Sequence, residues 1–314
     1  MCNIWAHPSR ERDEFEPSLL ENLPRLSFCN ITGGEPFLRD DIEDILDILE
    51  MKANRIVIST NGYLTDRIVD VVRKRKKLGV RVSLEGLPSA NDELRGIKDG
   101  FDHGLRTLLK LRGIGLKDIG FGITVSDRNI SDMPELYELS NAMGMEFATA
   151  VVHNSYYFHK YDNHIEDIER VAREFERLAF DLLKSKKVKN WFRAYFNMGL
   201  ANRVKGRRRP LPCEMGTDMF FLDPFGNILP CNGMDKPAIM GNLQEESFEA
   251  IWKSTRADEV RRGVRKCSKQ CWMIGSASPA MKKRIWVPLG WILRNKARMI
   301  MRKGKSIPLL SLGR

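Results

Sequence analysis

The chain has 314 residues, of which 42% are hydrophobic and 30% are charged, so it can bury a large core. It contains no run of eighteen apolar residues and no secretory signal in its first residues, which argues against a transmembrane or exported protein. Six cysteines in clustered spacings favour metal ligation in a reducing compartment over disulfides. We therefore expect a cytoplasmic protein with one large domain and one smaller domain.

The formal net charge of +11 is concentrated at the C-terminal end. No Asp or Glu follows Glu259, whereas fifteen Lys or Arg residues do, and the residues up to Glu259 are slightly acidic. This asymmetry predicts a surface partner for the tail and says little about the fold.

Apolar segments typical of strands alternate with amphipathic segments typical of helices over the first 184 residues. The expected strands lie at 26–31, 55–62, 80–86, 119–125 and 147–152, and the expected helices at 41–49, 65–77, 101–112, 132–143 and 165–184. Alternation at this spacing predicts a parallel sheet with right-handed crossovers. A charged, proline-terminated segment at 205–210 predicts the boundary with a second domain.

The turn after the first expected strand, Gly33-Gly34-Glu35-Pro36, is the most informative feature of the sequence. Two glycines let the backbone approach a ligand closely, and proline stiffens the turn. Glu35 would then be a carboxylate at the carboxyl end of a parallel strand, where α/β folds place their ligands. For this motif taken alone, an ordinary strand–helix turn is the alternative.

The segment Met1-Cys2-Asn3-Ile4-Trp5 upstream of this turn resembles the radical S-adenosylmethionine (SAM) enzymes. In that family a CxxxCxxC loop holds three irons of a [4Fe-4S] cluster, and Cys2 resembles the third cysteine of that loop. The first two cysteines and the strand before them are not in this sequence. The resemblance implies six strand–helix units, so we expect an α/β partial (β/α)6 parallel barrel that lacks its first strand, and a chain that is inactive as given.

The resemblance also implies that SAM binds at the ends of the strands. The Gly-Gly-Glu-Pro turn matches the motif that binds the methionine ammonium, which a carboxylate suits by its charge. The next two strand ends match positions near the ligand and the ribose-binding pair, where Asp is commoner than Glu. The implied SAM-binding residues are Gly33, Gly34, Glu35, Pro36, Ser59, Asn61, Ser83 and Glu85. Taken singly, the serines could be helix caps and Glu85 a solvated turn residue.

Four further cysteines form a second group. Seventeen residues separate Cys213 from Cys231, and three separate Cys267 from Cys271. A hairpin pattern between the first two would bring them together. Four thiolates suit a [4Fe-4S] cluster or a tetrahedral zinc ion. The segment 222–252 resembles the SPASM/Twitch auxiliary-cluster domain, which implies a single auxiliary [4Fe-4S] cluster that has no open iron and serves electron transfer.

Cys29 and three histidines are candidates for ordinary structural roles. Cys29 is expected to be a buried thiol that packs as a small hydrophobe. His153, His159 and His164 flank an aromatic run after the last expected strand and could line the substrate mouth. Their irregular spacing is weak evidence for a metal site, and a surface loop is the default interpretation.

The tail predicts an amphipathic helix from residue 289 onward. One face carries Leu293, Ala297 and Ile300 with Ile292 and Met299 beside them, a basic stripe carries Arg294, Arg298, Arg302 and Lys305, and Trp286 and Trp291 stand at the start. This pattern is typical of helices that bind anionic membrane surfaces. A helix packed on the barrel with a solvated basic face is an equally good interpretation.

Together these features predict a radical SAM oxidoreductase or maturase that uses a 5′-deoxyadenosyl radical to abstract a substrate hydrogen, with the auxiliary cluster transferring electrons. The expected parts are a barrel at 1–204, an auxiliary cluster domain at 205–281 and a tail at 282–314. The expected partners are SAM, an electron donor, an anionic membrane surface, and a substrate that is a peptide, a sugar, a lipid-linked intermediate or RNA. The alternatives are a decayed, non-catalytic relative stabilised by zinc or a cluster, and a membrane-surface assembly factor.

Overall fold

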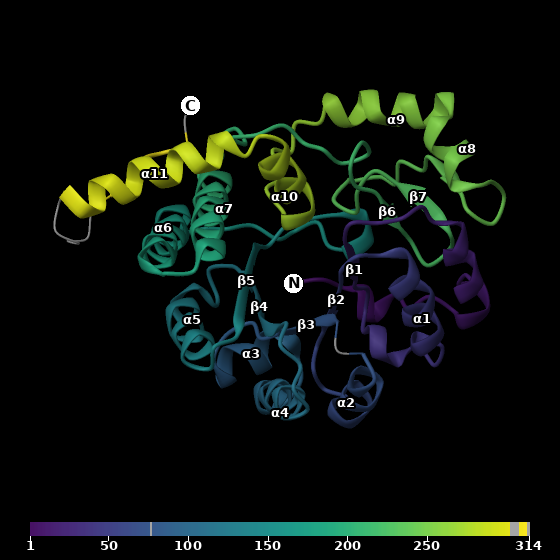
Figure 1. The fold of residues 1–314 in the computed structure, drawn as a ribbon, viewed down its shortest axis with the longest axis horizontal. Coiled ribbons are helices and arrows are strands. Elements are labelled where there is room, and N and C mark those ends of the chain that lie inside the picture. Colours follow the sequence, from purple (N-terminus) through teal and green to yellow (C-terminus); the bar gives the residue numbers. More distant parts are fainter. Residues whose placement is uncertain (76, 302–307, 313–314) are drawn as a thin grey trace.

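The computed structural model describes residues 1–75, 77–301 and 308–312. Its N-terminal part contains a five-stranded parallel sheet in the order β1-β2-β3-β4-β5. The strands are β1 (Cys29–Ile31), β2 (Ile56–Thr60), β3 (Leu78–Ser83), β4 (Ile119–Val125) and β5 (Glu146–Val151). The sheet curls, and helices form an arc around its outer side (Figure 1). The prediction of an α/β partial parallel barrel is confirmed.

The helices that connect the strands bury one side against the sheet. α1 (Ile42–Lys52) buries Ile42, Ile45, Leu46 and Leu49, which recur at the spacing of one helix face. The other connecting helices are α2 (Thr65–Arg73), α3 (Pro88–Arg95), α4 (Gly100–Gly113), α5 (Met133–Ala142) and α6 (Ile168–Lys184). α6 begins later than predicted, and its first residue, Ile168, is 42% exposed, so the start of the predicted apolar face is wrong.

One long helix, α7 (Val188–Val204), was not predicted from the sequence. It packs along α6 and is buried over most of its length. The buried residues include Asn190, Asn197 and Asn202. Because these polar side chains lie inside, the helix has no clean apolar stripe, and its periodicity is hidden.

The register of the sheet brings the carboxyl ends of the strands to one edge. Thr60 of β2 pairs with Val82 of β3, and Ser83 of β3 pairs with Gly122 of β4. Because parallel strands all end on the same side, the loops that follow them meet there. We call this edge, with the loops after β1 to β5, the barrel mouth.

The C-terminal part contains a small antiparallel sheet of β6 (Phe221–Leu222), β7 (Asn227–Leu229) and β8 (Gly241–Asn242). Asp223 closes the β6–β7 turn by accepting hydrogen bonds from the backbone N–H groups of Phe225 and Asn227, both at 3.0 Å. Gly226 in this turn has a φ of 81°, which glycine adopts without strain. The predicted hairpin is therefore confirmed.

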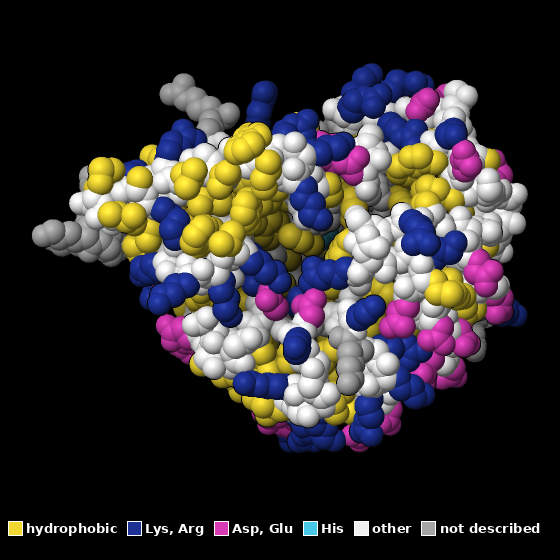
Figure 2. Space-filling view, viewed as in Figure 1, with side chains coloured by type: hydrophobic (Ala, Val, Ile, Leu, Met, Phe, Trp, Pro, Cys, Tyr) yellow, Lys and Arg dark blue, Asp and Glu magenta, His cyan; other side chains and the backbone are white. Residues whose placement is uncertain are grey.

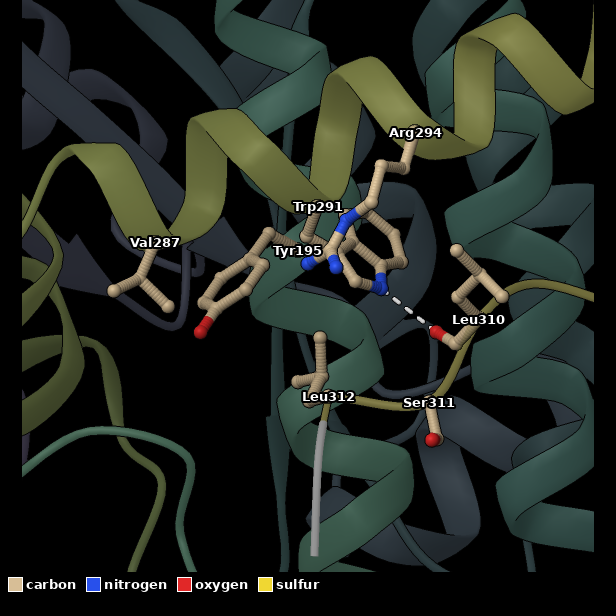
Figure 3. A pocket seen from close by; sticks show the side chains of 7 residues that line it. All are labelled: Tyr195, Val287, Trp291, Arg294, Leu310, Ser311 and Leu312. Atoms are coloured by element: carbon tan, nitrogen blue, oxygen red, sulfur yellow. Dashed lines mark hydrogen bonds between the residues drawn. The ribbon is translucent and has the colours of Figure 1, made fainter.

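Four helices follow the small sheet, namely α8 (Phe248–Lys253), α9 (Thr255–Arg265), α10 (Ile274–Lys283) and α11 (Trp286–Met301). The tail helix α11 packs on α7. Its Trp291 ring lies edge-on to Tyr195 of α7 at 5.6 Å and donates from Nε1 to the Leu310 carbonyl at 2.7 Å. These residues line a crevice of about 270 Å³ between α7, α11 and 310–312 (Figure 3). The tail helix is therefore packed on α7, and binding of its exposed side to a membrane surface stays a prediction.

The face by which α11 packs differs from the apolar face predicted for it. The buried residues are Pro288, Trp291, Ile292, Asn295 and Met299. Leu293 and Ile300 are instead 58% and 77% exposed, so the predicted apolar face lies at the surface. Arg302 and Lys305 of the predicted basic stripe lie outside the described residues. None of the described helices has the length and apolar character needed to cross a membrane.

Candidate active site

Glu35 joins the Gly-Gly-Glu-Pro turn to the end of β2. Its Oε1 accepts hydrogen bonds from Thr60 Oγ1 at 2.7 Å and from the Phe37 N–H at 3.2 Å, and its Oε2 accepts one from the Asn61 N–H at 2.7 Å. Burial raises the pKa of Glu35, and these three donors oppose the rise. A carboxylate has about four acceptor positions, so one position on Oε2 remains for a cation such as an ammonium.

The two glycines of the turn leave open backbone at the mouth. Both are exposed, and a methyl group built on Gly33 would have no atom within 4 Å, whereas one on Gly34 would lie 3.6 Å from the Ile4 side chain. Pro36 is buried and begins a short 3-10 helix, which fixes the far end of the turn. This geometry fits a ligand that approaches the backbone between the turn and the N-terminal residues.

Glu85 is buried at the end of β3, with 4% of its surface exposed. It pairs with Arg95 of α3 at 3.2 Å and accepts a hydrogen bond from the Thr124 N–H of β4 at 2.6 Å. Asn91 and Asn129 bind its backbone N–H and carbonyl, at 2.9 and 2.7 Å. Burial raises the pKa of Glu85, and the charge of Arg95 is the largest opposing influence. The interpretation of Glu85 as a solvated turn residue is therefore wrong.

The remaining predicted polar residues, Ser59, Asn61 and Ser83, are half-buried at the same edge of the sheet. Neither serine caps a helix, because the residues that precede α2 and α3 are Leu64 and Leu87. The simple capping alternative is therefore wrong for both. The structure thus brings the predicted SAM-binding residues to one barrel mouth, and their contact with SAM stays a prediction.

The N-terminal residues lie against this mouth, near the centre of the molecule (Figure 1). Asn3 is hydrogen-bonded through its backbone N–H and its side chain to two carbonyls of the loop after β5, at 2.7 and 3.0 Å. The Asn163 side chain donates to the Met1 carbonyl at 2.9 Å. Cys2, held between these contacts, is exposed. One thiol of the predicted radical-cluster loop is therefore at the mouth.

The three predicted histidines of the loop after β5 have different surroundings. The Nε2 atom of His153 is buried and has no hydrogen-bond partner among the described residues. His159 stacks on His7, with ring centroids 4.0 Å apart, and His164 is exposed. Burial lowers the pKa of His153. The three side chains do not form one group, in agreement with their irregular spacing.

The four C-terminal cysteines are neighbours in space. Cys213, Cys267 and Cys271 are all near enough to Cys231 to act on its pKa by charge. Cys213 and Cys267 are exposed, whereas the other two are half-buried. Over the described part of the chain, no three His, Cys, Asp or Glu side chains converge tightly enough to hold a metal ion. The four thiols thus lie near one another but are too far apart to share one metal ion. Thiolates are the usual ligands of iron–sulfur clusters, so their donor chemistry fits such a cluster.

Three cations, Arg203, Arg209 and Lys269, act on these thiols. Burial raises the pKa of Cys231 to about 11 and also raises that of Cys271, while the charges of Arg203 and Lys269 lower the pKa of Cys271. The guanidinium of Arg209 is close enough to Cys213 and Cys271 to interact with their charged forms. Because metal binds the thiolate, ligation here must release protons, and these cations favour that release.

Contacts from the loop after β5 join the barrel mouth to the cysteine-bearing part. The Tyr157 hydroxyl, in the loop after β5, donates to the Asp223 carboxylate at 3.3 Å. Lys269 Nζ donates to the Asn154 carbonyl at 3.3 Å and pairs with Asp235 at 2.6 Å. The surface is hollowed between the two parts, close to where the N-terminus is marked (Figures 1 and 2). A substrate in this hollow would lie between the SAM-binding edge and the cysteines.

Sequence reasoning missed the residues that hold these groups in place. Thr60 binds Glu35, Arg95 pairs with Glu85, and Arg209 and Lys269 lie at the cysteines. A buried carboxylate requires a donor or a cation, which was a signal that such partners exist. That requirement does not say which residue supplies the partner, because each partner comes from a different element.

Two protein families match this chain over the parts just described. Residues 6–140 match the radical SAM superfamily, and residues 213–272 match SPASM, an iron–sulfur cluster-binding domain. The first match contains Glu35 and Glu85, and the second contains all four C-terminal cysteines. SAM and [4Fe-4S] clusters are accordingly the cofactors of these two domains.

Curated relatives match unequal lengths of the chain. Fe-coproporphyrin III synthase of Methanosarcina barkeri is 39% identical over 111 residues, which cover 34% of this chain and 27% of the relative. The AdoMet-dependent heme synthase of the same organism is 25% identical over 298 residues, covering 88% of this chain and 82% of the relative. Mycofactocin maturase MftC of Mycobacterium tuberculosis is 24% identical over 270 residues, covering 81% and 67%. The chain therefore spans well under half the length of the first of these relatives.

A solved structure shares the fold. Native anSMEcpe with bound AdoMet and Cp18Cys peptide superimposes with a TM-score of 0.59 at 15% identity, covering 85% of this chain and 80% of that chain. The shared fold includes both the curled parallel sheet and the C-terminal part. The two family matches show that the chain carries a radical SAM domain within residues 6–140 and a C-terminal SPASM domain within residues 213–272.

Proposed function

We propose that this protein is a radical SAM oxidoreductase or maturase whose SPASM domain holds one auxiliary [4Fe-4S] cluster for electron transfer. The observation that supports this best is the barrel mouth itself, where Glu35 keeps an acceptor position beside the open backbone of Gly33 and Gly34. When bound, SAM and a reduced cluster supply a 5′-deoxyadenosyl radical. The side chains described above then bind, orient and enclose the reactants.

The residues of the mouth divide into two roles. Glu35 receives the methionine ammonium of SAM on Oε2, because its other acceptor positions are filled by the protein. Ser59, Asn61 and Ser83 line the same edge and offer hydrogen bonds to the rest of the ligand. Glu85 positions the ends of β3 and β4 through Arg95 and Thr124.

The cysteines also have two different roles in this proposal. Cys2 lies at the mouth and contributes a thiolate to the radical cluster. Cys213, Cys231, Cys267 and Cys271 hold the auxiliary cluster. With four protein ligands that cluster has no open iron, so it exchanges electrons without binding the substrate.

In this proposal an external donor would supply one electron, and SAM with the reduced radical cluster would provide the oxidising radical that takes one hydrogen atom from the substrate. The auxiliary cluster, held by Cys213, Cys231, Cys267 and Cys271, would accept the electron that the substrate gives up together with a proton, for a net dehydrogenation. An external acceptor would take that electron from the auxiliary cluster, so that one electron enters and one leaves in each turnover.

The substrate class that we favour is a heme precursor, with a peptide as the second candidate. The relative that matches over nearly the whole chain is named for heme synthesis, and the rim of the mouth presents the stacked rings of His7 and His159 beside Tyr156, a flat surface suited to an aromatic macrocycle. A peptide is supported by the solved structure that holds one. Sugars, lipid-linked intermediates and RNA have no such support here.

Because the sequence as given has only the third cysteine of the CxxxCxxC loop, the test uses a protein in which that loop is complete, reconstituted anaerobically with iron and sulfide and reduced with dithionite. We expect 5′-deoxyadenosine to form faster with iron coproporphyrin than with a cysteine-containing peptide, and to fall with Glu35→Gln. Asp40→Asn is the matched control, because Asp40 follows the same turn and its side chain is 89% exposed. Equal SAM binding by the wild type and Glu35→Gln would remove Glu35 from the site. Stimulation by the peptide alone would replace the first substrate class with the second.

A second proposal concerns the tail, which we infer to bind an anionic membrane surface. Trp286, Leu293, Ile300 and Met301 of α11 are 78%, 58%, 77% and 74% exposed. Figure 2 shows hydrophobic side chains gathered over this helix with Lys and Arg among them. Because no acidic residue follows Glu259, the charge of the tail complements anionic lipids.

Sedimentation with vesicles tests this second proposal. We expect binding to vesicles that contain phosphatidylglycerol, weaker binding as salt rises, and no binding to neutral phosphatidylcholine vesicles. The double change Leu293→Ser and Ile300→Ser should abolish binding. Ile274→Ser, which alters an equally exposed apolar residue on α10, should leave it unchanged. Binding to neutral vesicles alone, or self-association of the protein through α11, would contradict a membrane surface as the partner.

A further inference from the structure

Arg209 lies in the charged segment 205–210 that follows α7, where the sequence predicts only a linker. Its neighbours Arg207 and Arg208 are exposed, but the Arg209 side chain is folded into the C-terminal part and is half-buried. An arginine is costly to desolvate, so a half-buried guanidinium in a linker requires partners that offset the cost.

The guanidinium is hydrogen-bonded to backbone carbonyls on both sides of the cysteine group. Nε donates to Leu211 and Nη2 donates to Pro212 at 2.9 Å, in the segment that leads to Cys213. Nη1 donates to Cys271 at 2.8 Å, and Nη2 also donates to Ser276 at 3.1 Å. One side chain therefore links two cysteine-bearing segments that are far apart in the sequence.

The backbone of Arg209 adds a fifth link. Its N–H donates to the side chain of Gln270 at 3.0 Å. Gln270 has a φ of 51°, in the left-handed region that residues other than glycine seldom adopt. It stands between Cys267 and Cys271, so this hydrogen bond helps to hold a strained turn that sets the spacing of the two thiols.

The Arg209 side chain and the two segments that it links are also fixed against the barrel. The Arg209 guanidinium lies over the Trp272 ring, 5.4 Å from its centroid. Trp272 Nε1 donates to the Phe196 carbonyl of α7 at 2.8 Å. A methyl group on Gly199 of α7 would lie only 2.0 Å from this Nε1, so the glycine is required for the indole to pack there. Cys271 is thus held in a fixed position relative to α7, because its neighbour Trp272 packs on that helix.

The charge of Arg209 has a second consequence. A cluster with four thiolate ligands is negatively charged, and reduction adds one more negative charge. A cation near the thiolates stabilises the reduced form more than the oxidised form, since the attraction grows with the charge. The Arg209 guanidinium is hydrogen-bonded to the carbonyl of Pro212, next to Cys213, at 2.9 Å and to that of Cys271 at 2.8 Å, so its charge lies beside both segments.

We propose that Arg209 is a positioning residue for the auxiliary cluster: it clamps the segments that carry Cys213 and Cys271, and its charge raises the reduction potential of the cluster so that it accepts an electron. This inference rests on the proposed auxiliary cluster. It assigns the two effects to different properties of one side chain. The clamp depends on the fork of N–H donors, and the potential depends on the positive charge.

Two substitutions at Arg209 separate these effects. Arg209→Lys keeps the charge but cannot reach carbonyls on both sides, because an ammonium is a compact donor. Arg209→Gln removes the charge and most of the donors. Arg208→Gln is the matched control, since it removes the same charge from the adjacent exposed residue. The measurements are iron and sulfide per chain, and the midpoint potential of the auxiliary cluster by redox titration with electron paramagnetic resonance.

We expect Arg209→Lys to lower cluster occupancy at least twofold while the clusters that assemble keep the wild-type potential. We expect Arg209→Gln to lower occupancy further and to shift the reduced-to-oxidised ratio at a fixed potential about tenfold toward the oxidised form, which is 59 mV for one electron. Arg208→Gln should match the wild type in both measurements. If Arg209→Gln retains no cluster to titrate, the cluster occupancy and the midpoint potential of Arg209→Lys test the proposal.

Two results would overturn the inference. Wild-type occupancy in both Arg209 variants would exclude the clamp, and equal potentials in Arg209→Gln and Arg208→Gln would exclude the electrostatic effect. Failure of the proposed reaction is a separate outcome, because neither measurement depends on cleavage of SAM. A wild-type protein that binds zinc in place of iron under iron-replete, anaerobic conditions would remove the auxiliary cluster and this inference with it.

Discussion

The barrel mouth and the cysteine group are built in opposite ways. At the mouth the two predicted carboxylates are already engaged, Glu35 by three donors from the protein and Glu85 by Arg95 and Thr124. At the cysteine group two of the four thiols are exposed, and the described side chains do not converge into a metal site. Hydrogen bonds within the protein hold the side chains of the mouth in place. The four cysteines are held near one another by cations and by one strained turn.

This difference follows from what each region binds. An organic ligand such as SAM gains affinity from a site that is already arranged, because little conformational entropy is lost on binding. Cysteine thiols are different, since four thiolates brought together without metal would repel one another. Under the proposed function, metal binding would draw the four thiols together, so that metal binding and folding would be linked there.

The largest expected effect tests the dependence of the C-terminal part on metal. Replacing any one of Cys213, Cys231, Cys267 or Cys271 by Ala should remove about four iron atoms per chain and lower the melting temperature of the C-terminal part. Iron analysis and differential scanning calorimetry of the anaerobically reconstituted protein measure both. Cys29→Ala is the control, because Cys29 lies in β1 and burial raises the pKa of its thiol to about 11. Unchanged iron content in a Cys271→Ala protein would show that the thiols do not act together.

The second effect tests whether the mouth is held by its own ion pair. Glu85→Ala leaves Arg95 and the Thr124 N–H without their partner at a buried position, so the free energy of unfolding should fall by about 3–5 kcal/mol. Glu93→Ala changes an exposed pair on the same helix and should cost about 0–1 kcal/mol. Urea unfolding of both variants gives the comparison. Equal losses would mean that the Glu85 pair contributes no more than a surface pair.

The smallest effect concerns ligand binding at the mouth. Glu35→Gln keeps an acceptor for Thr60 but removes the negative charge, so SAM should bind about ten- to a hundredfold more weakly, the worth of a charge-assisted hydrogen bond of about 1.5–3 kcal/mol. The free energy of unfolding should change little. Isothermal titration with SAM measures the first quantity and urea unfolding the second. A large loss of stability with normal affinity would assign Glu35 to the turn alone.

Much of the fold follows from the sequence pattern. The strand predicted at 119–125 coincides with β4, and the apolar face predicted for α1 is the buried one, because these elements alternate cleanly between apolar and polar positions. α7 was not predicted, because its buried asparagines interrupt that alternation. The face of α11 was predicted wrongly, because a helix with apolar residues on two sides does not reveal which side packs.

The candidate site divides in the same way. The positions of Glu35 and Glu85 at one edge could be predicted, because a parallel sheet collects its strand ends there. The partners of these carboxylates could not, since Thr60 and Arg95 belong to other elements and are set by tertiary contacts. The contacts of Arg209 could not be predicted for a related reason, because a charged segment after a helix usually marks a solvated linker. The boundaries at 204 and 281 stay predictions, and α10 continues past the second.

The packing of Trp272 against Gly199 links the position of Cys271 to α7. Trp272 Nε1 donates to the Phe196 carbonyl of that helix, and only a glycine at position 199 leaves room for the indole. In the proposed cluster site, the placement of one thiolate ligand would therefore depend on a helix of the barrel domain, so the two domains could not mature independently.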